Sequence, residues 1–359
     1  MIETGNIEHI KDLDRTSLKL NSLRGRAFID ILIELYDLNS EYINKIARMY
    51  EVDKYYVNRL KSGSSRNRLE AVKILTNLGF TDKFKEIIDT IRKEENSEFL
   101  YRMLFYLTKS SLNIHQIEEV IYTILDKYKK GKLSFKEMSV LFSNMINKLS
   151  MNEVGRLIEL LNDEEQALMA FLDALYSSED KDNIPLDVIL NLLNKYNPEI
   201  LSRALKVIAM FKGRNLEKGD TLVHVFLSHP VWYVRLNAVK ALESFRCNRY
   251  VIKKLAELLY DDNWQVRSAS AGMLVRCMEG NFDIILSILE SKDEYAKQAI
   301  AEAISKSNAG VKLKEALKAC DTEDLIYAIK IMEILYHELG FTNTISQEDI
   351  EEVRKLCII

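Results

Sequence analysis

Two short segments of this chain repeat one another at an offset of 32 residues. The first is Trp232-Tyr233-Val234-Arg235 and the second is Trp264-Gln265-Val266-Arg267, and in each case a leucine follows seven residues after the arginine. A fixed period between about 20 and 50 residues is typical of solenoid proteins, whose units bury their apolar faces only by stacking on one another. The repeat therefore predicts an elongated array of similar units.

The position of this arginine can be followed along most of the chain. Arginine returns at the same phase in Arg68, Arg102 and Arg203. Weaker copies carry other residues at this phase, and one copy near Phe135 is inferred from spacing alone. The residues at the phase of the weaker copies are Leu168, Lys297 and Tyr327. Together with the two strong copies, the spacing predicts nine units.

Composition favours helices joined by short turns. Only 3 prolines and 12 glycines occur among the 359 residues, well below the usual shares of about 5% and 7%. Within the best unit, apolar residues return at helical spacing twice, first in Val234, Ala238 and Leu242 and again in Val251 and Leu255. Each unit is therefore predicted to be a helix pair, and the fold class to be all-α.

The strong copies also carry a family resemblance. A short polar turn, then Val-Arg, with Ala238 and Leu242 later in the same helix, resembles HEAT repeats, above all their short bacterial variety. The resemblance covers about 228–275 and 64–110. It implies a right-handed α-α superhelical solenoid of about nine HEAT-like helix pairs.

The same resemblance implies a ladder of polar contacts between repeats. In HEAT repeats the arginine commonly bonds an acidic residue at the turn before its helix, which here would pair Arg267 with Asp261 or Asp262. Before Arg235 the corresponding turn is Ser228-His229, which has no acid. The resemblance therefore implies the ladder at Arg267 and leaves it open at Arg235.

The ends of the chain are expected to differ from the array. We predict a polar tail at 1–16, a capping helix pair at 17–63, the HEAT-like array at 64–340 and a capping helix at 341–359. Ser346 is the expected N-cap of that last helix, because a serine side chain can accept a hydrogen bond from the first turn.

No constellation typical of catalysis or cofactor binding occurs in the sequence. The five histidines include no pair at metal-ligand spacing, and we find no glycine-rich phosphate loop or nucleophile elbow. The di-iron deoxyhypusine hydroxylases, which are HEAT-like enzymes, need repeated His-Glu pairs, whereas His337-Glu338 is a single one. We therefore predict no enzyme and no catalytic, cofactor-binding or metal-binding residue.

Cysteine usage and hydropathy indicate a cytoplasmic protein. None of the four cysteines belongs to a Cys-x-x-Cys pair, so we expect buried reduced thiols. They are Cys247, Cys277, Cys320 and Cys357. The chain opens on polar and acidic residues, unlike a signal peptide. Its longest uncharged run, 221–234, has 14 residues, while a spanning helix needs about 20, so no transmembrane segment is predicted.

The strong copies are also the best candidates for binding a protein partner. Trp, Tyr and Arg dominate the binding energy of protein interfaces, and Trp232, Tyr233, Arg235, Trp264 and Arg267 gather in these copies. The leading hypothesis is a non-enzymatic scaffold that presents these residues on the concave, inner layer of helices. In the alternative, the tryptophans pack between repeats and the arginines cap turns.

Nucleic-acid binding is the rival function. The 50 basic and 54 acidic residues are intermixed, so the chain lacks the overall basic charge of a generic nucleic-acid binder. A local basic groove, as in the HEAT-like DNA glycosylases, stays open. In addition, the segment 44–60 resembles a helix-turn-helix through Ala47, Val52 and Val57, although Glu51 stands where that family usually has glycine.

A looser resemblance suggests the partner. The block Leu23-Arg24-Gly25-Arg26, with the segment from Arg66 to Gly79, is similar to HEAT-repeat proteins that accompany membrane glycosyltransferases of bacterial exopolysaccharide systems. It implies peripheral association with a membrane complex. Those relatives usually carry an N-terminal membrane helix, and we predict none here.

Overall fold

Helices account for the regular structure of this protein. The computed structural model describes residues 19–178, 180–214, 216, 223–246, 248–307, 322–340, 347–348 and 350–351. Among these residues, β pairing is confined to one isolated bridge between Leu216 and Phe245. The predicted all-α fold class is therefore confirmed. The chain divides into two units, Met1–Pro185 (unit 1) and Leu186–Ile359 (unit 2).

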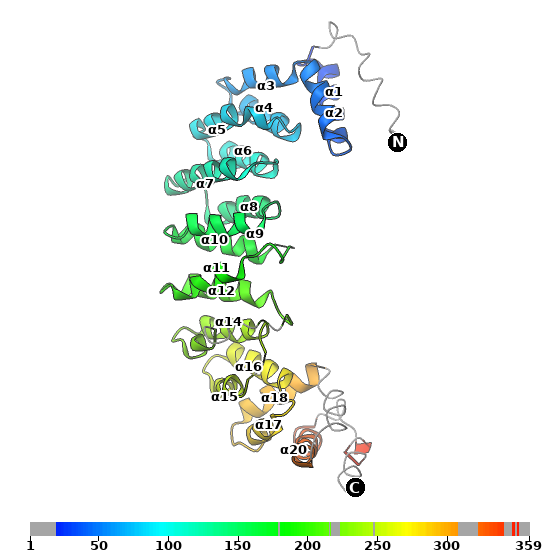
Figure 1. The fold of residues 1–359 in the computed structure, drawn as a ribbon, viewed down its shortest axis with the longest axis vertical. Helices are drawn as coiled ribbons and strands as arrows, with labels where there is room; N and C mark the ends of the chain where they lie inside the picture. Colours follow the sequence, from blue (N-terminus) through cyan, green and yellow to red (C-terminus); the bar gives the residue numbers. More distant parts are fainter. Residues whose placement is uncertain are drawn as a thin grey trace. The chain divides into compact units, whose positions relative to one another are not determined.

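In unit 1 the helices alternate between two layers (Figure 1). The first-layer helices pack successively on one another, and they are α4 (Ser65–Asn77), α6 (Ser97–Lys109), α8 (Phe135–Ile146) and α10 (Glu165–Tyr176). Between them in sequence come α5 (Phe84–Lys93), which follows the 3-10 turn η3 (Thr81–Lys83), α7 (Ile114–Lys129) and α9 (Met151–Leu160). The unit starts with α1 (Leu23–Tyr36), α2 (Ser40–Met49) and α3 (Val52–Leu60), the last of which packs on α4.

Unit 2 repeats this alternation. Its first-layer helices also pack successively, and they are α12 (Pro198–Ala209), α14 (Trp232–Leu242), α16 (Trp264–Arg276) and α18 (Glu294–Lys306). The intervening elements are α11 (Leu186–Asn191) with η4 (Leu192–Asn194), η5 (Val225–Ser228), α15 (Arg249–Glu257) with η6 (Leu258–Tyr260), and α17 (Phe282–Leu289). After them come α20 (Thr322–Glu333), which packs on α17, and the π-helical turn η7 (Ile334–Glu338).

Capping boxes define the repeats in 110–165, where spacing alone predicted them. The side chains of Asn113, Ser134 and Ser150 are the N-caps of α7, α8 and α9, and each pairs reciprocally with a Gln or Glu three residues later. Such boxes satisfy two backbone donors that the first turn of a helix otherwise leaves unpaired. Local polar chemistry therefore starts these helices where the hydrophobic repeat pattern is faint.

The predicted repeat phase is confirmed. All nine positions, from Arg68 to Tyr327, lie in nine different helices, namely α4, α6, α8, α10, α12, α14, α16, α18 and α20. Within each unit the spacing identified helices that stack successively on one another, α4 to α10 in unit 1 and α12 to α18 in unit 2, whereas α20 packs on α17. The handedness of the solenoid stays a prediction.

Two expectations need correction. The segment 17–63 holds three helices, α1 to α3, where we expected a pair. Cys277 is disulfide-bonded, so the expectation of a reduced thiol is wrong at this position. The tail 1–16, the proposed N-cap Ser346 and the other three cysteines lie outside the described residues. The division into tail, caps and array stays a prediction.

Two helical glycines should respond oppositely to substitution by alanine. A Cβ at Gly25 would lie 2.3 Å from the carbonyl oxygen of Lys19 and 2.6 Å from Cα of Leu20, so the backbone must move. We expect Gly25→Ala to cost about 1–3 kcal/mol. A Cβ at Gly272 would meet no atom within 4 Å, so Gly272→Ala should stabilise by about 0.5–1 kcal/mol. Urea unfolding of both variants checks the pair, and equal signs would contradict the packing of Gly25.

Candidate partner-binding surface

Three aromatic side chains are exposed at the amino ends of successive first-layer helices. Trp232 and Trp264 are the first residues of α14 and α16, and Tyr295 is the second residue of α18. Their exposed fractions are 40%, 65% and 71%. Because α14 packs on α16 and α16 on α18, these side chains recur at the amino ends of helices stacked in one layer. We call Trp232, Trp264 and Tyr295 the aromatic row. Neither tryptophan is buried between repeats.

Tyr233 and Arg235, both predicted site residues, have internal partners. Tyr233 is half-buried, and its hydrogen bond to the Glu199 carboxylate raises its pKa. In Arg235, Nη1 donates to the carbonyl oxygens of His229 and Pro230 at 2.8 and 3.0 Å, while Nε and Nη2 donate to the Asp261 carboxylate at 2.6 and 2.8 Å. Arg235 therefore caps its own turn and forms a bidentate ion pair with the next one.

Arg267 makes only the first half of this pattern. Its Nη1 donates to the carbonyl oxygens of Asp261 and Asp262 at 2.6 and 3.1 Å, and its guanidinium carbon lies 5.5 Å from the centre of the Tyr295 ring. The predicted partners are therefore correct in position, but Arg267 contacts their backbone. The Asp261 carboxylate pairs with Arg235, so this contact runs from the arginine forward to the turn of the following repeat. Arg235, whose preceding turn has no acid, takes its carboxylate partner from the following turn instead.

The same forward contact occurs in unit 1. Arg68 Nη1 donates to the Ser62 carbonyl oxygen at 2.8 Å, and Nη2 donates to the Glu94 carboxylate at 2.5 Å. In sequence, Glu94 follows Arg68 by 26 residues, as Asp261 follows Arg235. We call the pairs Arg68–Glu94 and Arg235–Asp261 the arginine rungs. Each rung joins a first-layer helix to the turn before the next first-layer helix.

Both rung carboxylates are buried, with exposed side-chain fractions of 3% for Glu94 and 5% for Asp261. Burial by itself raises the pKa of each carboxyl, but the hydrogen bonds from the rung arginine and from a backbone N–H outweigh it. The backbone donors are the N–H groups of Asn96 and Asn263. The net result is a pKa below the ordinary value in both cases, so the two acids are charged at neutral pH.

A surface cavity of about 470 Å³ lies beside the carboxy-terminal half of the aromatic row. Trp264, Arg267 and Tyr295 line it, together with Glu302 and Lys306 from α18. The Lys306 ammonium donates to the Glu302 carboxylate at 2.7 Å. The cavity therefore combines two exposed aromatic rings, one guanidinium and an ion pair that neutralises itself.

The helix-turn-helix-like segment 44–60 forms a sharp turn between α2 and α3. Glu51 has φ of 56°, in the left-handed region that glycine usually occupies. Ala47 and Val52 are buried and Val57 is half-buried. The turn geometry of the resemblance is therefore present despite the glutamate.

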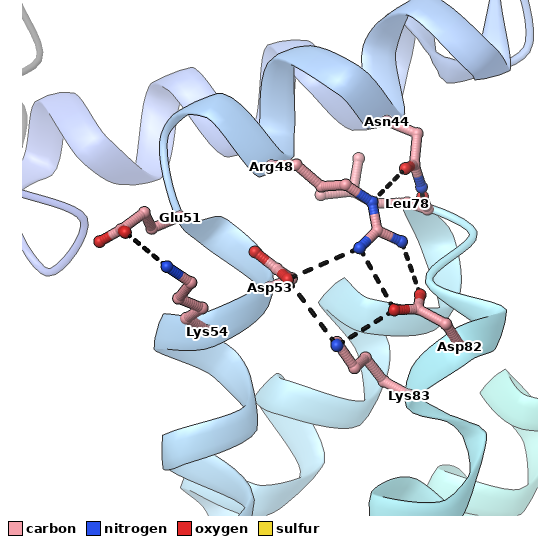
Figure 2. Close-up of polar contacts among 8 residues, drawn as sticks. All are labelled: Asn44, Arg48, Glu51, Asp53, Lys54, Leu78, Asp82 and Lys83. Carbon is pink, nitrogen blue, oxygen red and sulfur yellow. Dashed lines mark hydrogen bonds and ion pairs between the residues drawn. The ribbon is translucent and has the colours of Figure 1, made fainter.

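Most cations of this segment are paired within the protein. Figure 2 shows Arg48 donating to the Asp82 carboxylate at 2.6 and 3.2 Å and lying 3.7 Å from Asp53. Lys54 pairs with Glu51 at 2.7 Å. Arg59 similarly pairs with Glu70 at 2.8 Å. Arg48 thus joins α2 to η3 and Arg59 joins α3 to α4, and the pairing within the described residues leaves few free cations to contact phosphates.

The Arg48–Asp82 contact should give a small, acid-sensitive stabilisation. The hydrogen bond from Arg48, followed by smaller effects that include Lys83, lowers the pKa of Asp82 to about 2 from 3.8. Stabilisation is therefore complete above about pH 4 and is lost as the pH falls towards 2. Because Asp82 is 46% exposed, Asp82→Asn should cost no more than about 1 kcal/mol at pH 7. Thermal melting at pH 7 and pH 3 should show a smaller difference between wild type and variant at pH 3.

The described residues contain neither a cluster suited to a metal ion nor a membrane-spanning helix. No group of three or more His, Cys, Asp and Glu side chains is placed to hold a metal ion there. Likewise, no helix in the described part of the chain is long and apolar enough to cross a membrane.

Comparison with known families places the aromatic row within a recognised repeat. Residues 186–275 and 219–305 match the family model for HEAT repeats. Residues 186–305 are HEAT repeats. The HEAT-repeat segment includes α14 and α16 and the rung Arg235–Asp261, so the predicted resemblance over 228–275 is confirmed. Residues 64–110 lie outside both matches.

Solved structures with similar folds are distant in sequence. The chain is similar to an engineered protein, with 16% identity, a TM-score of 0.43 and 98% of each chain covered. It is also similar to Kap121p bound to Ste12p and to Kap121p bound to Nup53p, each with 11% identity and a TM-score of 0.48. These alignments cover 92% of this chain and 43% of Kap121p, so the chain spans less than half the length of that protein. No curated protein matches the sequence.

Tyr295 and Glu94 are the site residues that the sequence prediction missed. Tyr295 follows Trp264 by 31 residues, but it stands in a weak copy whose phase residue is Lys297. Aligning the N-caps Asn263 and Asp293 would have placed Tyr295 one position after Trp264, in the first turn of its helix.

Proposed function

We propose that this chain is a non-enzymatic scaffold or adaptor that binds a protein partner through the first-layer helices of unit 2. The observation that carries the proposal is the exposed aromatic row beside the guanidinium of Arg267, within HEAT repeats. Aromatic and arginine side chains contribute most to protein interfaces, and exposing three large rings in water is unfavourable unless another surface covers them. We further propose that this face is the concave one, as expected from the fold class.

The partner that we propose is a membrane-associated glycosyltransferase of a polysaccharide system, bound from the cytoplasm. Support comes from the resemblance of 23–26 and 66–79 to HEAT-repeat proteins of such systems. Association would then be peripheral.

A pull-down tests the surface. Wild type, the double variant Trp232→Ala/Trp264→Ala and the control Tyr196→Ala would each be used as bait. Tyr196 is 99% exposed but is not part of the aromatic row. Its substitution therefore controls for non-specific binding by exposed aromatic side chains. We expect at least one protein that wild type and Tyr196→Ala retain and that the double variant loses. Equal recovery of every protein by folded baits would rule out this surface.

Nucleic-acid binding by 44–60 is a second candidate, favoured by the left-handed turn at Glu51. It predicts retention of a labelled DNA duplex at about 50 mM salt and a steep loss of affinity towards about 200 mM, because phosphate contacts release counterions. Lys45→Ala/Lys54→Ala should weaken this binding. Absence of retention at the lower salt would eliminate the candidate.

A further inference from the structure

The turns before three first-layer helices each contain the same type of hydrogen bond, but the residue whose side chain accepts it differs. Two positions before the N-cap of α6, α16 and α18 stand Glu94, Asp261 and Ser291. Each side chain accepts a hydrogen bond from the N-cap backbone N–H, at 3.1, 2.9 and 3.4 Å. Ser291 therefore replaces the local role of the acid, but it has no charge to offer to the arginine of the preceding repeat.

Arg267 is that arginine. In Arg235, the Nε and Nη2 edge donates to the carboxylate of the next turn. In Arg267, the donations to acceptors in the described residues come from Nη1 alone, and no carboxylate in that part of the chain lies within ion-pair distance. The side chain is half-buried, and the Tyr295 ring and two backbone carbonyls hold its guanidinium in place. Its forked edge is thus oriented without a carboxylate from this chain.

The surroundings of this fork suit a peptide. Trp264 and Tyr295 line the cavity of about 470 Å³ together with Arg267, whose guanidinium carbon lies 5.5 Å from the centre of the Tyr295 ring. Lys306 and Glu302 neutralise each other at 2.7 Å, so the lining carries one positive charge in excess. One guanidinium matches the single charge of a carboxylate. A phosphate dianion would require a second free cation, which the lining does not supply.

We propose that the Arg267 fork binds an aspartate or glutamate side chain of a partner peptide, while Trp264 and Tyr295 bind an apolar neighbour of that acid. This inference rests on the proposed function, because it assigns a partner chemistry to the same surface. The partner's carboxylate takes the place that Asp261 has in the rung with Arg235. Planar, bidentate pairing is the geometry that arginine and carboxylate prefer.

Ser291→Asp provides a sharp test, because it supplies the missing acid from within the chain. In this variant the new carboxylate should pair with the Arg267 fork and form a third rung, which should raise the melting temperature. Because the fork is then occupied, the variant should lose peptide binding although it is more stable than wild type. Arg267→Gln should also lose binding, by removing the fork. Arg276→Gln is the matched control, since Arg276 ends the same helix and donates to the Glu243 carbonyl oxygen, away from the cavity lining.

The probe is an array of random peptides about 12 residues long, each paired with a copy in which Asn and Gln replace Asp and Glu. Wild type and Arg276→Gln should bind acidic peptides about tenfold or more tighter than their amide copies, because charge-assisted hydrogen bonds are lost in the latter. Ser291→Asp and Arg267→Gln should lose this preference.

The outcomes separate the two proposals. In one outcome, Trp264→Ala abolishes peptide binding, but the binding shows no preference for acids and does not respond to Ser291→Asp or Arg267→Gln. The proposed aromatic surface would then be supported, and the proposal of an acidic partner would be wrong. If Trp264→Ala changes nothing in peptide binding, both proposals fail for this surface.

Discussion

Asp261→Ala should lower the free energy of unfolding of unit 2 by roughly 3 kcal/mol, whereas Asp262→Ala should change it by less than about 0.5 kcal/mol. Asp261 is 5% exposed and accepts two hydrogen bonds from Arg235 and one from the Asn263 N–H. Removing it leaves the half-buried guanidinium without its counter-charge. Asp262 is exposed and contributes its carbonyl oxygen, which alanine retains.

Hydrogen exchange of the amides in α14 and α16 is the appropriate measurement for this pair. Repeat arrays need not unfold in one step, so a global midpoint can average a local change away. Protection in both helices should fall in Asp261→Ala and stay near wild type in Asp262→Ala. Similar losses in the two variants would show that the rung contributes no more than an ordinary surface acid.

Neutralising both rung acids should produce a large stability loss that depends on pH. The pKa of Glu94 and that of Asp261 are lowered in the folded protein, so their stabilisation is complete above the unfolded values of about 4.3 and 3.9 and is lost as the pH falls through the lower folded values. The variant Glu94→Gln/Asp261→Asn should therefore melt well below wild type at pH 7, and this gap should narrow below about pH 4.

The matched control for this titration is Glu95→Gln/Asp262→Asn, which alters the adjacent acid in each turn. Glu95 is 74% exposed and forms ion pairs with Lys127 at 3.7 Å and Lys132 at 3.2 Å, and Asp262 is exposed, so the control should lose much less stability than the rung variant. A gap for the rung variant that does not change between pH 7 and pH 3 would mean that shape, and not charge, gives the rungs their effect.

The repeat architecture was predictable from sequence because its signal is periodic. Within each unit the first-layer helices meet similar neighbours, so one position repeats from Arg68 to Leu168 and again from Arg203 to Lys297 even where its residue type changes. The three-helix start was signalled only by the helix-turn-helix resemblance of 44–60, because glutamate favours helices and its residue type does not mark Glu51 as the residue with positive φ.

The candidate site was predictable in part. The recurrence of identical residues at one offset identified Trp232, Trp264 and Arg267. Trp264 and Arg267 line the cavity, and Trp232 is exposed at the surface. The direction of the rungs was not predictable, since the partner 26 residues ahead is brought close only by the stacking of one repeat on the next. For the same reason, sequence spacing alone could not distinguish Arg235, whose guanidinium has a carboxylate partner, from Arg267, which has none in the described residues.

The replacement of an acid by Ser291 also has a mechanical consequence. A rung fastens α14 to the turn before α16, but none fastens α16 to the turn before α18 in the described residues. When unit 2 is stretched along its length, the interface between α16 and α18 should therefore separate before the interface between α14 and α16. A ligand that contacts both Arg267 and α18 would then hold these two helices together. The force needed to separate the repeats would therefore depend on whether the partner is bound.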